Sequence, residues 1–185
     1  MAKVKAFLKR KNIEISFKRY GIDALGAMAQ GLFCSLLIGT IIGTIGNLAG
    51  IELFSQIGGY TKDVCGVAMA VAIGYALKAD PMVLFSLATV GYAANSIGGA
   101  GGPLAVLVIA IIAAEFGKAV SKETKIDILV TPAVTILIGV GLSALIAKPI
   151  GDAANAFGEL IKYATDLQPF LMGITVSVLD RKSVV

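Results

Sequence analysis

The sequence predicts an all-α, polytopic integral membrane protein with about six transmembrane segments, the last of them truncated, and a short basic amphipathic amino-terminal helix. The chain is 57% hydrophobic and 15% charged, whereas soluble domains are about 45–50% apolar and about 25% charged. The mean hydropathy is +0.87, and the apolar segments recur along the chain, unlike those of a cleaved targeting peptide. The 22 glycines suit membrane helices that pack through small residues.

Residues 1–20 are the first predicted domain, a basic interfacial segment. Apolar residues alternate there with a crowd of cations, which are Lys3, Lys5, Lys9, Arg10, Lys11, Lys18 and Arg19. A basic amphipathic segment that lies on an anionic membrane surface explains this pattern best. Membrane lipids are therefore expected partners, and nucleic acid is not.

Residues 21–179 are the second predicted domain, which is embedded in the membrane. Its first span covers 22–48, longer than the ~20 residues that a bilayer requires. The mixed stretch 51–63 is interpreted as an interfacial turn. A second span covers 63–80 and is short unless it extends back through Gly58 and Gly59.

The third segment, 81–94, is short, and the glycine-rich stretch NSIGGAGGPLAV at 95–106 follows it. A fourth span covers 103–120. The stretch 121–127, SKETKID, is a polar loop.

The fifth span, 128–151, is expected to be kinked or broken near Pro132, because proline removes a helical hydrogen bond. Residues 152–166 are interpreted as an amphipathic or interfacial helix. A sixth segment starts at 167 but stops at 179, too short to cross a bilayer.

Residues 180–185, DRKSVV, are predicted to be a non-native tail. The same hexapeptide results from translation of a common sequencing adapter that is followed by a stop codon. The alternative is a genuine polar carboxy terminus.

The distribution of lysine and arginine predicts that the amino terminus is cytoplasmic. After four crossings the chain is inside again, where Lys118, Lys122 and Lys125 stand. If the third segment were re-entrant, these lysines would lie outside, against the rule.

The glycine-rich stretch does not fit a phosphate-binding loop, since Gly102 is followed by Pro103 rather than by lysine and a hydroxyl residue. Two interpretations remain: a tight turn between helices, or a discontinuous-helix site in which Asn95 and Ser96 contact substrate. The candidate hinge residues are Gly98, Gly99, Gly101, Gly102, Pro103 and Pro132.

Three further residues are candidates for the substrate pathway. Glu115 is an acid at membrane depth, although a structural ion pair with Lys118 explains it equally well. Thr131 either compensates the kink at Pro132 or lines a polar site. Glu159 belongs either to a solvated helix face or to a lid near the membrane.

The chain contains no histidine, so a histidine base, a phosphohistidine and a histidine metal ligand are excluded. Cys34 and Cys65 both lie in apolar segments, where packing is a better explanation than a disulfide. No metal site, no cofactor and no nucleophile–base arrangement is expected.

Three stretches together resemble a known family: KRKNIEISFKRYGIDALGAMAQGLFCSLLIGTIIGTIG, AEFGKAVSKETKIDILVTP and GELIKYATDLQPFLMGI. They are similar to the amino-terminal half of the phosphotransferase-system enzyme IIC (EIIC) membrane proteins, in the branch described as perfringolysin-regulator-like. The resemblance covers about 1–179.

The resemblance implies a sugar permease subunit of a phosphoenolpyruvate-dependent system in the bacterial plasma membrane. It further implies IIA and IIB partners that carry the phosphoryl group, and a homodimer when the chain is full-length. The acidic residue used in better-known branches has no match here, so no catalytic residue is assigned. Two alternatives stay open: a membrane sensor or regulator without transport, and an ion or small-solute carrier.

Overall fold

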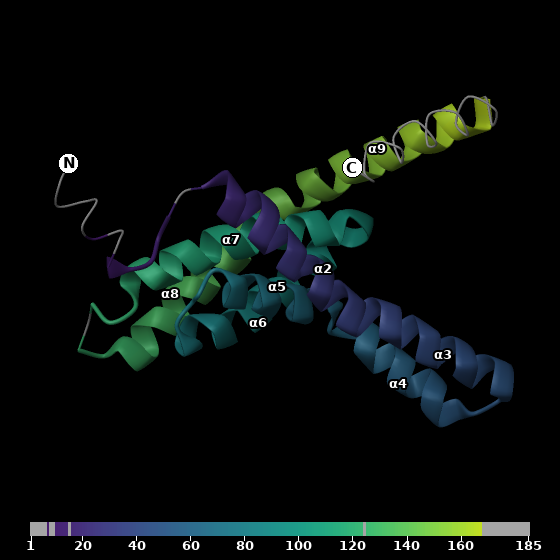
Figure 1. The fold of residues 1–185 in the computed structure, drawn as a ribbon, viewed down its shortest axis with the longest axis horizontal. Helices are drawn as coiled ribbons and strands as arrows, with labels where there is room; N and C mark the ends of the chain where they lie inside the picture. Colours follow the sequence, from purple (N-terminus) through teal and green to yellow (C-terminus); the bar gives the residue numbers. More distant parts are fainter. Residues whose placement is uncertain (1–6, 8–9, 15, 124, 168–185) are drawn as a thin grey trace, which may run out of the picture.

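The computed structural model describes residues 7, 10–14, 16–123 and 125–167, together with their side chains except those of 160, 161 and 163–167. Every regular element in this part of the chain is a helix (Figure 1). The order is η1 (Lys18–Asp23), α2 (Ala24–Leu32), η2 (Phe33–Leu37), α3 (Ile38–Ala49), α4 (Glu52–Asp63), α5 (Cys65–Ala76), α6 (Pro81–Gly98), η3 (Gly99–Gly101), α7 (Gly102–Val120), α8 (Asp127–Leu142), η4 (Ser143–Ala147) and α9 (Lys148–Leu167).

Three helical stretches are long and apolar enough to cross a membrane. They are Lys18–Ala49, Pro81–Val120 and Asp127–Glu159. The middle stretch is the hairpin of α6 and α7, and α5 is a shorter apolar helix. The chain is therefore an all-α membrane protein, as its composition predicts.

The first long helix and the segment after it form an extended hairpin. α2 packs on α5 and α3 packs on α4, and the two halves are joined at Gly50, which adopts a left-handed backbone conformation (φ 67°). The interpretation of 51–63 as a turn is wrong, because these residues form α4 and lead directly into α5. Glycines allow α4 to pack closely on α3. Gly58 of α4 lies so near Gly43 of α3 that a Cβ at Gly58 would not fit between the two helices.

The second hairpin, α6 and α7, forms the centre of the bundle. Gly98 lies beside Ala105 and Gly117 lies beside Val83, so the two helices run antiparallel along their whole lengths. The connection is only η3, where Gly99 takes a positive φ of 56°. The glycine-rich loop is thus shorter than 95–106, and the third segment reaches four residues beyond the predicted 94.

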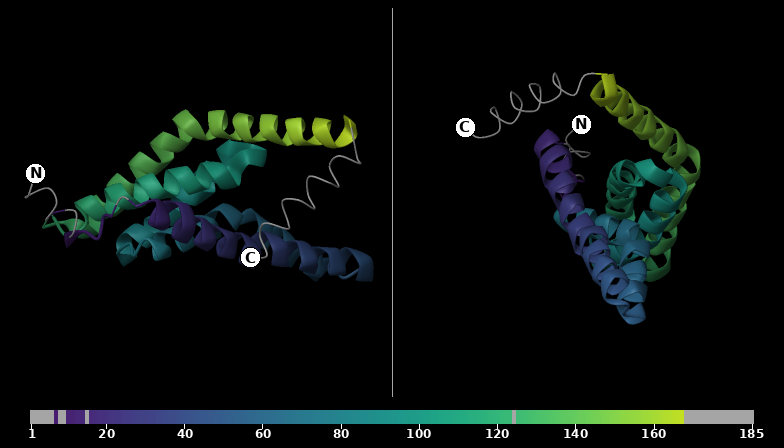
Figure 2. Two further views of the ribbon diagram at one scale, coloured as in Figure 1. Left: turned by 45° about the horizontal axis from the view of Figure 1, so that its top comes forward. Right: turned by 90° about the vertical axis from the view of Figure 1, so that its right-hand side faces the viewer.

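The last described helices form one long rod that bends. α8 continues through Pro132 without a break, contrary to one of the two predicted outcomes. The chain changes direction where α8 passes through η4 into α9, next to Pro149 (Figure 2). Proline and a wide helical turn are both common causes of such bends. The predicted helix over 152–166 is confirmed within α9.

The hydrophobic core lies between α5, α6, α7 and α8. Its largest fully buried apolar side chains come from three of these helices and include Met69, Ile73, Leu87, Val90 and Ile109. α9 and the α3–α4 hairpin extend from this bundle in different directions (Figure 1).

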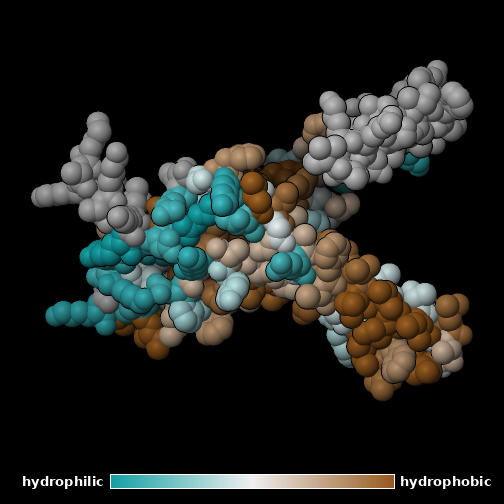
Figure 3. All heavy atoms as spheres, viewed as in Figure 1, coloured by the Kyte–Doolittle hydropathy of each residue, from teal (hydrophilic) through white to brown (hydrophobic). Residues whose placement is uncertain are grey.

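Hydrophilic residues gather at the opposite end of the bundle (Figure 3). We call this region the polar end and define it as residues 10–14, 77–80 and 118–123. Of the predicted basic interfacial segment over 1–20, the structure describes 7, 10–14 and 16–20, and the interfacial position of this segment stays a prediction. Residues 13, 14 and 16 have no regular structure, and Asn12 has a φ of 53°. Lys18 and Arg19 belong to the first long helix instead.

Candidate functional site

A buried lysine on α7 links three segments of the chain at the polar end through hydrogen bonds. The Lys118 side chain is 2% exposed, and its Nζ donates hydrogen bonds to the carbonyl oxygens of Asn12 and Leu77, both at 3.1 Å. It also donates to Glu115 Oε1 at 2.9 Å. All three Nζ hydrogens therefore have acceptors, as a buried ammonium group requires. The ion pair that the spacing of Glu115 and Lys118 predicted is present.

Arg19 reinforces the same junction. Its guanidinium donates to the Leu77 carbonyl oxygen at 2.6 Å and to Asn12 Oδ1 at 3.1 Å. The carboxyl end of α5 thus receives two cations, which is electrostatically favourable at a helix carboxyl terminus. The amino-terminal segment, α5 and α7 are held at one point.

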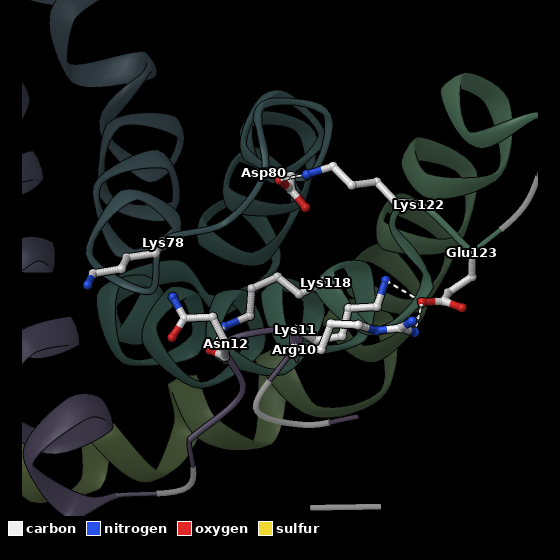
Figure 4. A pocket seen from close by; sticks show the side chains of 8 residues that line it. All are labelled: Arg10, Lys11, Asn12, Lys78, Asp80, Lys118, Lys122 and Glu123. Carbon is white, nitrogen blue, oxygen red and sulfur yellow. Dashed lines mark hydrogen bonds and ion pairs between the residues drawn. The ribbon is translucent and has the colours of Figure 1, made fainter. Parts of the chain in front are cut away.

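Above Lys118 lies a basic pocket with a volume of about 270 Å³ (Figure 4). Glu123 Oε1 is 2.5 Å from an Arg10 nitrogen and 2.6 Å from Lys11 Nζ. On the other side of the pocket, Lys122 Nζ lies 2.5 Å from Asp80 Oδ1. The pocket is lined by Arg10, Lys11, Asn12, Lys78, Asp80, Lys118, Lys122 and Glu123.

The Asp80–Lys122 ion pair joins the loop before α6 to the loop after α7. Partial burial opposes ionisation of Asp80, but hydrogen bonds from Lys122 and Ser121 outweigh it and hold the pKa below its ordinary 3.8. The hydrogen bond with Asp80 raises the pKa of Lys122 above its ordinary 10.5.

The contribution of this pair to stability is expected to have two limits. A lowered carboxyl pKa stabilises the fold above pH 3.8, and this contribution is lost as the pH falls below that value. A raised lysine pKa stabilises the fold below pH 10.5 and is lost as the pH rises through the raised pKa. Because Lys122 is exposed, the effect is at most about 1 kcal/mol. The protection factors of the amides of residues 77–80, which are corrected for the intrinsic pH dependence of exchange, should fall outside these limits. Lys122→Gln should show the lower protection throughout. A Lys125→Gln variant with the same low protection would contradict the assignment.

A second polar pocket of about 310 Å³ lies next to the basic pocket. The two share Asn12 and Lys78 in their linings. The second pocket is also lined by Glu14, Ser16, Lys18, Arg19, Asp23 and Ala76.

A larger groove of about 730 Å³ lies between α2 and α5. Asp23 and Ala76 line both this groove and the second pocket. The groove therefore adjoins the second pocket at these two residues. Its lining is completed by Ile22, Gly26, Ala27, Gln30, Gly31, Cys34, Ala68, Val71, Ala72, Tyr75 and Leu84.

The local sequence explains why this groove exists. The residues that line it repeat every three or four positions on each helix, so each set forms one helical face. These faces are rich in glycine and alanine, and Gly31 packs directly against the backbone of Ala68. Small side chains leave the groove open, while three polar side chains, Asp23, Gln30 and Tyr75, remain exposed in it.

Asp23 lies inside the first long helix rather than at its start. The helix begins at Lys18, and Asp23 has helical dihedral angles and no capping hydrogen bond. Its exposed carboxylate therefore belongs to the groove. A polar group at such a position in a membrane helix is a candidate for function.

The predicted pathway residues are spread over the molecule. Asn95 and Ser96 lie in the last turns of α6, at the end of the bundle away from the polar end. Asn95 contacts α5 at Gly66 and α7 at Gly102, whereas Ser96 is exposed. Glu159 is exposed on α9.

Only Glu115 and Thr131 are near the polar end. Thr131 is fully buried, and its hydroxyl donates to Asp127 Oδ1 at 2.5 Å. It therefore does not compensate the carbonyl freed by Pro132. Neither Thr131 nor Glu115 lines a described pocket, and the involvement of both in a substrate pathway stays a prediction.

Five of the six hinge candidates, Gly98, Gly99, Gly101, Gly102 and Pro103, lie at the far end, whereas Pro132 lies in α8 next to Thr131. Gly101 packs against Gly151 of α9, which anchors the base of that helix. Pro103 stands in the first turn of α7, as expected for a proline that begins a helix. A hinge role for these residues stays a prediction.

Sequence reasoning missed Gln30, Tyr75 and Asp80 as site residues. The periodic glycines and alanines around Gln30 could have indicated the groove, because small residues on one helical face predict close packing against another helix with space left beside it. The pairing of α2 with α5 carries no local signal. The predicted tail 180–185 lies outside the described residues.

The comparisons with known proteins agree with this architecture. The sequence profile described as "Phosphotransferase system, EIIC" matches residues 22–180. No curated protein and no solved structure matches the chain. The match covers most of the chain, including the α2–α5 groove, so this chain belongs to the EIIC family, the membrane subunits of sugar phosphotransferase transporters.

Proposed function

We propose that this chain is the sugar permease subunit of a phosphoenolpyruvate-dependent phosphotransferase system and that the α2–α5 groove binds the sugar. The observation that carries the proposal is the groove itself. It combines small apolar walls with a carboxylate, an amide and a phenol, and it shares Asp23 and Ala76 with the second polar pocket.

The chemistry of the groove suits a neutral polyhydroxylated ligand. The Asp23 carboxylate accepts hydrogen bonds, the Gln30 amide both donates and accepts, and the Tyr75 hydroxyl does the same. The ring of Tyr75, which is 78% exposed, offers a flat apolar surface. Ligand sites are mostly apolar cavities of about 300–1,000 Å³ with a few polar groups, and the groove falls in this range at about 730 Å³.

The proposed orientation puts the polar end in the cytoplasm. The cations of residues 10–14, 77–80 and 118–123 support it through the positive-inside rule. Sugar that leaves the groove through the second polar pocket would then reach the IIA and IIB partners, which the family implies. A homodimer in the bacterial plasma membrane, with several crossings per chain, is part of the same proposal.

The test is uptake of radiolabelled hexoses and hexitols by cells or vesicles that contain the protein and its IIA and IIB partners. We expect uptake that requires phosphoenolpyruvate. Asp23→Asn and Gln30→Leu should each reduce it, because a lost hydrogen bond of about 0.5–1.5 kcal/mol raises KM roughly two- to tenfold.

Matched controls are available on α4. Asp63→Asn and Gln56→Leu make the same changes at exposed positions outside the groove and should leave uptake unchanged. If the groove variants take up sugar as well as the wild type does, the sugar binds outside the groove. A complete lack of phosphoenolpyruvate-dependent uptake would favour a sensor or regulator instead.

A further inference from the structure

The basic pocket at the polar end has more positive charge than its own carboxylates neutralise. Five cationic side chains and two carboxylates line it. Glu123 forms ion pairs with both Arg10 and Lys11, and Asp80 forms an ion pair with Lys122. Within the part of the chain that the structure describes, Lys78 has no ion-pair partner.

The backbone of this pocket is also unusual. Non-glycine residues rarely adopt a positive φ, and such strained residues concentrate at functional sites. In the described part of the chain three non-glycine residues do so: Asn12 (φ 53°), Lys78 (φ 54°) and Lys122 (φ 62°). All three line the basic pocket.

Lys78 shows most clearly that local stability does not explain this arrangement. It follows α5, and the amide of Ala79 donates back to the Gly74 carbonyl oxygen at 2.9 Å, which closes the helix end. Glycine is the residue that such a left-handed helix end favours. A lysine there costs stability, and its exposed side chain lines the pocket, with its nitrogen turned away from the other labelled side chains (Figure 4).

We propose that the basic pocket binds a phosphate group. For one phosphate to bind Lys11, Lys78 and Lys122, the exposed Lys78 side chain would turn into the pocket, and Lys11 and Lys122 would share the phosphate with Glu123 and Asp80. Because the three lysines come from different chain segments, binding would also link the amino-terminal segment to the two loops. Lysine ammonium groups bind phosphate as point charges, and the pocket volume of about 270 Å³ admits one. This inference goes beyond sugar transport, and its readout is binding rather than uptake.

The test measures the thermal unfolding midpoint of the full chain in phosphatidylcholine nanodiscs while sodium phosphate is titrated at constant ionic strength against sodium chloride. A saturable rise is expected for the wild type. Lys78→Gly should unfold at the same or a higher temperature without ligand, because glycine relieves the backbone. Its half-saturating phosphate concentration should nevertheless rise roughly tenfold, the value of one charge-assisted hydrogen bond.

The control and the source of the phosphate are tested in the same assay. Lys125→Gln removes an exposed cation next to the pocket but outside its lining and should bind like the wild type. If a lipid headgroup is the source, phosphatidylglycerol nanodiscs should raise the midpoint and abolish the response to soluble phosphate; if not, that response should persist in them. The proposal is overturned if neither anion has a saturable effect, or if Lys78→Gly responds like the wild type.

Discussion

Replacement of Lys118 by methionine is expected to lower the free energy of unfolding by about 3–5 kcal/mol. The substitution keeps the length of the side chain but removes the ammonium group, which is 2% exposed. It leaves the Glu115 carboxylate, at 15% exposure, without its ion-pair partner. It also removes hydrogen bonds from the carbonyls of Asn12 and Leu77. The measurement is unfolding of the purified protein by sodium dodecyl sulfate in mixed micelles.

A double variant separates the buried charge from the packing. Glu115→Gln together with Lys118→Met removes both charges and should recover more than half of the loss, because removal of a whole buried pair is often nearly neutral. Lys62→Met on α4, an exposed lysine, should stay within about 0.5 kcal/mol of the wild type. A Lys118→Met variant as stable as this control would show that the polar end does not depend on the buried lysine.

Introduction of a methyl group at Gly91 is expected to destabilise the bundle by about 1–3 kcal/mol, the usual cost of overpacking a core. Gly91 of α6 faces Gly66 of α5, and a Cβ at Gly91 would collide with the Gly66 carbonyl oxygen and the Ala70 side chain. Since the obstacle includes backbone, α5 and α6 must separate to admit the methyl group. The same unfolding assay measures the loss.

Gly141→Ala on α8 is the matched control. A Cβ there has nothing within 4 Å, and alanine favours a helix over glycine by roughly 0.5–1 kcal/mol. The control should therefore be as stable as the wild type or slightly more stable. Equal stability of Gly91→Ala and Gly141→Ala would contradict the close α5–α6 contact.

The sequence predicted the fold class and most helix positions because apolar composition and length dominate in a membrane. The prediction for 51–63 was wrong, because the polar residues Glu52, Gln56 and Lys62 favoured an interfacial turn over a helix. The small residues that pack α4 on α3 outweigh this polarity. It also placed Asn95 in a loop, because four glycines were assumed to end both helices, whereas only Gly99 reverses the chain.

The functional sites were harder to predict than the fold. The ion pair between Glu115 and Lys118 followed from their spacing on one helix. The groove did not, because it depends on which helix lies against α2, and nothing in the local sequence around Asp23 or Gln30 specifies α5. The basic pocket is similar: its cations come from three separate segments that meet only in the folded chain.

The central claim, that the α2–α5 groove binds sugar, is tested most directly by protection of a natural cysteine. Cys34 is exposed in the groove, whereas Cys65 is buried. N-ethylmaleimide should thus modify Cys34 selectively in the detergent-purified protein, and a Cys34→Ser variant should lose the label. A saturating concentration of the sugar identified by uptake should slow the modification several-fold, with a half-effect near the KM. An unchanged rate with that transported sugar would contradict the account.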